Sequence, residues 1–344
     1  MTNHALKTLL LFLSSHAAFS YADSNQTATT PETTPKVVSS IYPLQQIANE
    51  IVGEPTDLIA DSYLSPHHYS LKPSDINGLQ DADIVLWIGS AMMPQLKNTI
   101  KNREKNENHT TITASTLPGI QLITEEKGHG HDDHGHGHDD HGHGHDDHGH
   151  GHDDHGHDHH ESDLHNKAGE PIFYDPHLWL STENAITIAT ALAAELGRID
   201  SAHQARYEVN LAQFIAKINR TRETIRTQLA AEVPKPYFIF HNAYAYFEQE
   251  FGIKNQGVIR NHSAQQANTQ HLNEIKNQLS GGAAACLFTE PQFESPIIKK
   301  LAEGSSVTVS ILDPVGYSST EQTGYAAILE NLAKAVSQCP SREL

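Results

Sequence analysis

Four side chains that can bind a transition metal lie next to expected strand ends or helix starts. His67 lies in the loop after a short strand, and His177 lies just before a helix. His241 and Asp313 each close an apolar strand. In open α/β sheets, ligands bind outside the carboxyl ends of the strands, where His67, His241 and Asp313 are expected. Two lobes that face each other could bring His67 and His177 from one and His241 and Asp313 from the other onto one ion, and three neutral imidazoles plus one oxygen suit tetrahedral zinc. The spacing alone is weak evidence, because a lone histidine beside a strand is more often structural.

The ligand types narrow the choice of metal but leave other classes of protein open. Sites rich in imidazole favour zinc, copper or nickel, whereas manganese prefers carboxylates, so zinc is expected, with manganese or another divalent metal as the alternative. A secreted zinc-dependent hydrolase would also use three protein ligands and an open position. It would need a general base, for which Glu290 is available, but the sequence lacks an H-E-x-x-H motif. A metal buffer without a transport partner is the third interpretation.

Residues 128–160 contain only glycine, histidine and aspartate, and they hold 15 of the 26 histidines of the chain. The unit His-Asp-Asp-His-Gly-His-Gly repeats through this segment. Since no residue is apolar, nothing compensates the entropy of ordering the segment, and we expect a disordered loop inserted in a folded lobe. We interpret it as a weak accessory reservoir for metal ions, with incidental binding by a solvated loop as the alternative.

The rest of the chain alternates short apolar strands with helices. This alternation predicts an α/β fold with two lobes, each with a mostly parallel sheet flanked by helices. In the first lobe, a strand is expected at residues 37–42, followed by a helix that begins at Pro43 and stops at Gly53. Residues 201–231 predict one helix of about 45 Å, which is long enough to bridge the lobes.

The first 22 residues have the features of a cleavable secretory signal peptide. Lys7 supplies a positive charge, residues 9–13 are apolar, and the small residues Ser20 and Ala22 precede the cleavage site. A membrane anchor is the disfavoured alternative, because the apolar run is far below the ~20 residues of a spanning helix. We therefore expect a protein of the bacterial periplasm.

The net charge argues against nucleic acid as a partner, and the cysteine content favours one disulfide. The formal net charge of -19 makes nucleic acid an unsuitable partner, because phosphates would be repelled. An exported protein folds in an oxidising compartment, which favours one disulfide between Cys286 and Cys339, with two buried free thiols as the alternative.

Five segments occur in a fixed order along the chain: Pro66-His67-His68-Tyr69-Ser70-Leu71-Lys72-Pro73-Ser74-Asp75, His177-Leu178-Trp179-Leu180, Phe240-His241-Asn242-Ala243-Tyr244-Ala245-Tyr246-Phe247, Thr289-Glu290-Pro291-Gln292-Phe293 and Leu312-Asp313-Pro314. Together with the histidine-rich insert before the second segment, they resemble the ZnuA-like zinc-uptake substrate-binding proteins of ABC transporters, in the metal-binding cluster A-I family. The resemblance covers essentially the whole chain after the signal peptide.

This resemblance implies two α/β lobes joined by one long helix, with the metal in the cleft between them. His67, His177 and His241 match the three histidine ligands of the family. The fourth ligand varies among members between an acidic side chain and water. Where one relative has a glutamate directly before the first ligand, this chain has Pro66, which closes that option. Asp313 is the expected fourth ligand, with water or Glu290 as alternatives.

The resemblance also implies a binding protein rather than an enzyme. Such a protein captures Zn²⁺ in the cleft and delivers it to the membrane permease of its ABC transporter. Cys286 and Cys339 match a disulfide that some members contain. We expect a monomer with this domain organisation: signal peptide 1–22, disordered leader 23–36, N-terminal lobe 37–180 with its loop 128–160, linking helical segment 181–233 and C-terminal lobe 234–344.

Overall fold

The computed structural model describes residues 34–60, 65–124, 164, 172–260, 268–293, 296–317 and 324–339. The expected signal peptide, most of the expected leader and the histidine-rich loop lie outside these residues. The elements of the fold all belong to one unit, Pro35–Leu344. No helix in the described part of the chain combines the length and apolar character needed to cross a membrane.

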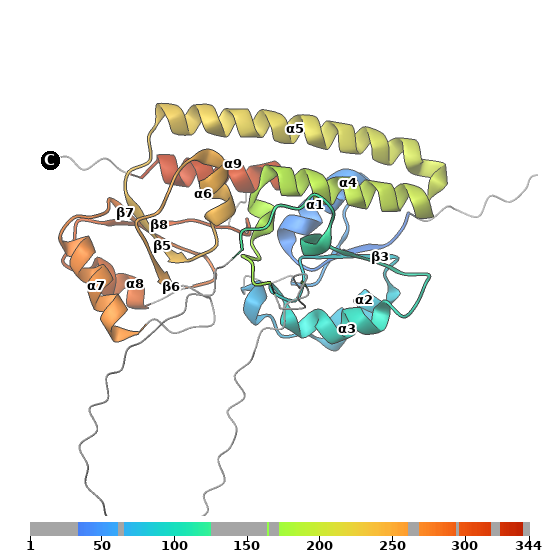
Figure 1. Ribbon diagram of the computed structural model, residues 1–344, viewed down its shortest axis with the longest axis horizontal. Helices are drawn as coiled ribbons and strands as arrows, with labels where there is room; N and C mark the ends of the chain where they lie inside the picture. The colour runs from blue at the N-terminus through green and yellow to red at the C-terminus, as the bar shows by residue number, and fades with distance from the viewer. Residues whose placement is uncertain are drawn as a thin grey trace, which may run out of the picture. The chain divides into compact units, whose positions relative to one another are not determined.

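Two sheets of four parallel strands form the two halves of this unit (Figure 1). Their strand orders are β2-β1-β3-β4 and β6-β5-β7-β8. In each sheet the chain starts at a central strand, moves to one edge and then returns to the other side. The strands are β1 (Val37–Ser39), β2 (Asp57–Leu58), β3 (Ile84–Trp87), β4 (Thr110–Thr113), β5 (Tyr237–His241), β6 (Gly257–Arg260), β7 (Cys286–Thr289) and β8 (Thr308–Ile311). The predicted fold class, two α/β lobes with parallel sheets, is confirmed.

Three of the four central strands are mostly apolar and buried along their whole length. Every residue of β1, β3 and β5 is buried, as expected for parallel strands that are covered on both faces. The strand expected at residues 37–42 is shorter than predicted and ends at Ser39. The following helix already begins at Tyr42, because Pro43 occupies its first turn, where the lack of a backbone N–H costs no hydrogen bond.

Helices cover the sheets and connect the two halves. The helix after β1 ends at Gly53, which has φ +87° and donates its N–H to the carbonyl oxygen of Asn49 at 2.9 Å. The helices are α1 (Tyr42–Val52), α2 (Pro73–Asp81), α3 (Lys97–Arg103), α4 (Thr182–Ile199), α5 (Gln204–Ala231), α6 (Ala245–Phe251), α7 (Thr269–Ser280), α8 (Pro296–Ala302) and α9 (Tyr325–Ser337). Two short 3₁₀ turns, η1 (Pro66–His68) and η4 (Leu178–Leu180), carry or follow candidate ligands.

The long helix expected at 201–231 is α5, which has 28 residues and spans about 42 Å. It contacts α1, α4, α6 and α9, and Figure 1 shows it lying along both α4 and α9. Its first expected turn is instead a 3₁₀ turn, Ser201–His203. The Asp200 carboxylate accepts a hydrogen bond from the Tyr207 hydroxyl at 2.7 Å and holds this turn against the start of α5.

A disulfide joins Cys286 in β7 to Cys339, directly beyond α9, with a Cα–Cα distance of 5.9 Å. The expected pairing is therefore confirmed. Both cysteines are buried, so the link fastens the end of the last helix to the core of the second sheet.

Candidate metal centre

One candidate histidine ends a parallel strand, and a second lies in a connection that follows one. His241 is the last residue of β5, the strand from which the chain leaves first to β6 and later returns to β7. The crevice at such a reversal of strand order is the usual ligand site of open α/β sheets. His67 lies in η1, within the connection from β2 to α2 of the other sheet.

His177 comes from the segment that precedes η4 and α4. Its backbone N–H donates to Asp175 Oδ1 at 2.9 Å, and its ring Nδ1 lies 2.7 Å from the same oxygen. Asp175 therefore fixes both the turn and the orientation of the ring. Helix α4 follows at once, because the Ser181 hydroxyl accepts from the Asn184 N–H and caps it.

The three imidazoles converge through the same ring nitrogen. His177 Nε2 lies 3.2 Å from His67 Nε2 and 3.2 Å from His241 Nε2. All three potential ligand atoms lie within 4.8 Å of one another. A tetrahedral zinc ion with Zn–N bonds of 2.0–2.1 Å would require neighbouring nitrogens about 3.3 Å apart. The observed spacing therefore suits one shared ion.

Buried carboxylates orient two of these rings. Asp175 holds His177 through Nδ1, and Glu290, the residue after β7, holds His241 through Nδ1. A proton on each Nδ1 leaves the Nε2 lone pairs facing one another, which is the tautomer a metal needs. Without a cation these lone pairs would repel one another across 3.2 Å.

The electrostatic environment favours a neutral His177 ring and a divalent cation. Burial lowers the pKa of His177 well below its ordinary value, and the neighbouring His241 lowers it further. Burial also raises the pKa of the Glu290 carboxyl, an effect that His241 partly offsets. The two buried carboxylates beside the rings, Asp175 and Glu290, are a source of negative charge that a divalent cation would balance.

The rings surround a small cavity of about 10 Å³. A space of this size holds about one water molecule. Apart from the imidazoles, the surface of its wall is largely apolar, so few water molecules can enter the cavity. Electrostatic interactions between the wall and a bound ion are therefore stronger than in water. The residues that line it are Ser65, Pro66, His67, Met92, His177, His241, Glu290, Gln292, Pro314 and Val315.

Asp313 lies close to this cavity but outside the three-histidine group. Its Oδ1 accepts hydrogen bonds from the backbone N–H groups of Val315 at 3.0 Å and Gly316 at 2.9 Å. These bonds shape the turn that places Pro314 and Val315 on the cavity wall. The expectation that Asp313 is the fourth ligand therefore stays a prediction.

The structure places at the site one residue that the sequence analysis missed, and it shows a different contact for a second residue than the sequence analysis expected. Asp175 was not among the expected site residues; its only sequence signal was its place two residues before His177. Glu290 was considered as a ligand or a general base, but its carboxylate faces Nδ1 of His241.

Hydrogen bonds hold the His177 segment against the second half of the molecule. The Tyr246 hydroxyl donates to the carbonyl oxygen of Asp175 at 2.8 Å, and the Trp179 indole N–H donates to that of Pro314 at 2.8 Å. The Tyr325 hydroxyl donates to the carbonyl oxygen of Trp179. Elements from both halves thus position the three rings.

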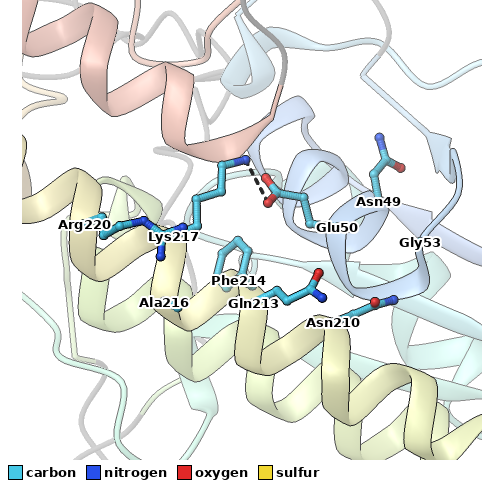
Figure 2. Close-up of a pocket in the computed structure, with 9 residues that line it drawn as sticks. All are labelled: Asn49, Glu50, Gly53, Asn210, Gln213, Phe214, Ala216, Lys217 and Arg220. Atoms are coloured by element: carbon cyan, nitrogen blue, oxygen red, sulfur yellow. Dashed lines mark hydrogen bonds and ion pairs between the residues drawn. The ribbon is translucent and has the colours of Figure 1, made fainter.

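A second, much larger pocket of about 630 Å³ lies between α1 and α5 (Figure 2). Its polar lining includes Asn49, Asn210 and Gln213, and an ion pair joins Lys217 Nζ to Glu50 Oε2 at 3.0 Å. Figure 2 shows the Lys217 side chain reaching across to Glu50. The pocket contains no imidazole, so it does not offer the ligand set expected for zinc.

Comparison with known proteins identifies relatives over almost the whole chain. Residues 37–339 match the model of the family described as ZnuA, zinc-uptake complex component A, periplasmic. The high-affinity zinc uptake system protein ZnuA of Haemophilus ducreyi is 36% identical over 309 residues, covering 88% of this chain and 92% of that protein. Its counterpart from Brucella suis is 34% identical over 312 residues, covering 89% of this chain and 92% of that protein. A crystal structure of ZnuA aligns with a TM-score of 0.68 at 21% identity, covering 90% of this chain and 100% of that chain.

Proposed function

The chain belongs to the ZnuA family of zinc-uptake substrate-binding proteins of ABC transporters, and from this premise we propose that it binds one Zn²⁺ ion as cargo through His67, His177 and His241. The observation that carries this proposal is the convergence of three Nε2 atoms, with two of the distances at 3.2 Å. These rings come from three segments that are far apart in sequence, so their meeting at zinc-ligand spacing is a property of the fold.

Transport explains the site better than hydrolysis does. A zinc hydrolase needs an open metal position beside a space for substrate, and a base within reach of a bound water. Here the cavity has about 10 Å³, and Asp175 and Glu290 are engaged with the Nδ1 atoms of two ligand rings. The arrangement suits retention of an ion, in agreement with the zinc-uptake role of the relatives.

The location and partner of the protein follow from the same proposal. Residues 1–22 direct export to the periplasm, and the mature chain, acting as a monomer, delivers zinc to the membrane permease of its transporter. The lobes comprise residues 37–180 and 234–344, with 181–233 as the linking segment. Residues 128–160 bind additional ions weakly and raise the metal concentration near the tight site.

The site is tested by zinc calorimetry on a variant that lacks residues 128–160. One tight ion per protein is expected, with the affinity of the complete mature chain but a lower total stoichiometry. Introducing His67→Ala, His177→Ala or His241→Ala should then remove the tight phase. If all three variants keep the original affinity, the ligand assignment is wrong, and if the loop deletion alone removes the tight phase, the separation of the two sites is wrong.

The transport role needs a separate test in cells. A strain that lacks this protein should grow poorly when zinc is chelated, and added zinc should restore growth. Unimpaired growth of that strain under zinc starvation would contradict an uptake role and would favour a metal buffer.

A further inference from the structure

Gln292 lines the metal cavity and carries a buried amide. It is one of the residues that surround the space between the three histidines. Both polar atoms of the amide, Nε2 and Oε1, are buried and have no hydrogen-bond partner among the residues that the structure describes. Buried amides are normally paired, because an unpaired one loses its hydrogen bonds to water without replacement.

The two carboxylates beside the ligand rings already have defined partners. Glu290 is bound to Nδ1 of His241, and Asp175 is bound to Nδ1 of His177. The neighbouring wall is formed in part by Met92 and Val315, which offer no strong hydrogen bond. The Gln292 amide is therefore a buried, unpartnered group at this wall, and water on a bound ion would give it a hydrogen-bond partner.

Zinc chemistry defines the partner that this amide can take. Three imidazoles leave one position of a tetrahedral zinc ion open, and water commonly fills it. Zinc makes its bound water much more acidic than bulk water, so this water is a strong hydrogen-bond donor. The amide oxygen of Gln292 is an acceptor that fits it.

We propose that Gln292 is a positioning residue for metal selectivity: its Oε1 accepts a hydrogen bond from the water that completes the coordination of zinc. The proposal rests on the zinc-binding function argued above. A neutral amide at this point keeps a carboxylate away from the fourth position. Since carboxylate ligands favour manganese, this neutrality also favours zinc over manganese.

The main test compares Gln292→Met with Gln278→Met in the complete mature chain. Both changes replace an amide by a thioether of similar volume, but Gln278 is exposed on α7 and is not among the residues that line the metal cavity. One equivalent of metal is added so that the tight site fills first. Gln292→Met should weaken zinc binding by about 10- to 100-fold, as for other groups that support metal ligands. It should also change the visible absorption of the Co²⁺ complex, whereas Gln278→Met should alter neither property.

A second variant, Gln292→Glu, keeps the shape of the side chain and an acceptor oxygen while adding charge. It should retain zinc binding and raise the affinity for Mn²⁺ relative to Zn²⁺ by about tenfold or more, because a carboxylate now reaches the ion or its water. Competition of the two metals for the same protein sample measures this ratio. This variant keeps the proposal testable if Gln292→Met does not fold.

The controls separate this inference from the proposed function. If His67→Ala removes tight binding but both Gln292 variants keep the wild-type zinc affinity, cobalt spectrum and metal ratio, the role of Gln292 is wrong and zinc binding stands. If Asp313→Asn changes the cobalt spectrum and Gln292→Met does not, Asp313 fills the fourth position instead. If His67→Ala has no effect, the zinc site itself is wrong.

Discussion

The pocket between α1 and α5 and the cavity between the three histidines differ in volume by more than tenfold, and the smaller one has the chemistry of a metal site. The pocket between α1 and α5 measures about 630 Å³ and is lined by amides and an ion pair. The cavity between the two sheets measures about 10 Å³, yet it collects three imidazole nitrogens, and two carboxylates face their rings. A metal ion needs several donor atoms at short, fixed distances, so volume says little about where it binds.

The ligand rings should show the largest effect on zinc binding. We expect His177→Ala to weaken tight binding by more than about 100-fold, beyond the range of changes in supporting groups, because it removes the nitrogen that lies between the other two. Calorimetry with one equivalent of zinc measures this loss. If the variant kept the wild-type zinc affinity, the small cavity would not be the tight zinc site, and the contrast with the large pocket would fail.

The supporting carboxylate should have the second largest effect. In Asp175→Asn the amide no longer offers a charged acceptor to Nδ1 of His177, which lies 2.7 Å from the carboxylate in the wild type. We expect an affinity loss of about 10- to 100-fold, measured by competition with a chelator. A loss as large as that of His177→Ala would indicate that Asp175 itself binds the ion.

Acid should destabilise the metal-free protein through His177. The pKa of this ring is well below its ordinary value of 6.5 in the folded protein, so the unfolded chain takes up the proton first. The stability associated with the neutral ring is therefore complete above about pH 6.5 and is lost as the pH falls toward the folded pKa. Thermal unfolding across this range should show a falling midpoint in the wild type, with a smaller slope in His177→Gln. Equal slopes would contradict this assignment.

The smallest effects should come from the large pocket. Lys217→Met removes the ion pair with Glu50, whose side chains are 39% and 22% exposed. Since such pairs are screened by solvent, we expect a loss of at most about 1 kcal/mol in the free energy of unfolding. Zinc affinity should not change, because the pair takes no part in the three-histidine group. A change of tenfold or more in zinc affinity would show that the two regions are coupled.

The sequence by itself determined the alternation of strands and helices, the disulfide partners and the three histidines that the fold brings together. Strands such as β3 and β5 are continuous apolar runs, and apolar periodicity is a local property of the chain. The resemblance to a known family added the order of the motifs, which assigned His67, His177 and His241 to one site.

Only the tertiary structure decided how these rings are held and what surrounds them. Asp175 and Glu290 act through contacts to Nδ1 atoms, and the orientation of a carboxylate cannot be read from spacing along the chain. The same holds for Asp313, whose Oδ1 accepts hydrogen bonds from its own turn, and for Gln292, whose amide is buried at the cavity. A residue type shows what chemistry is available, whereas the direction of each side chain depends on packing between segments that are distant in sequence.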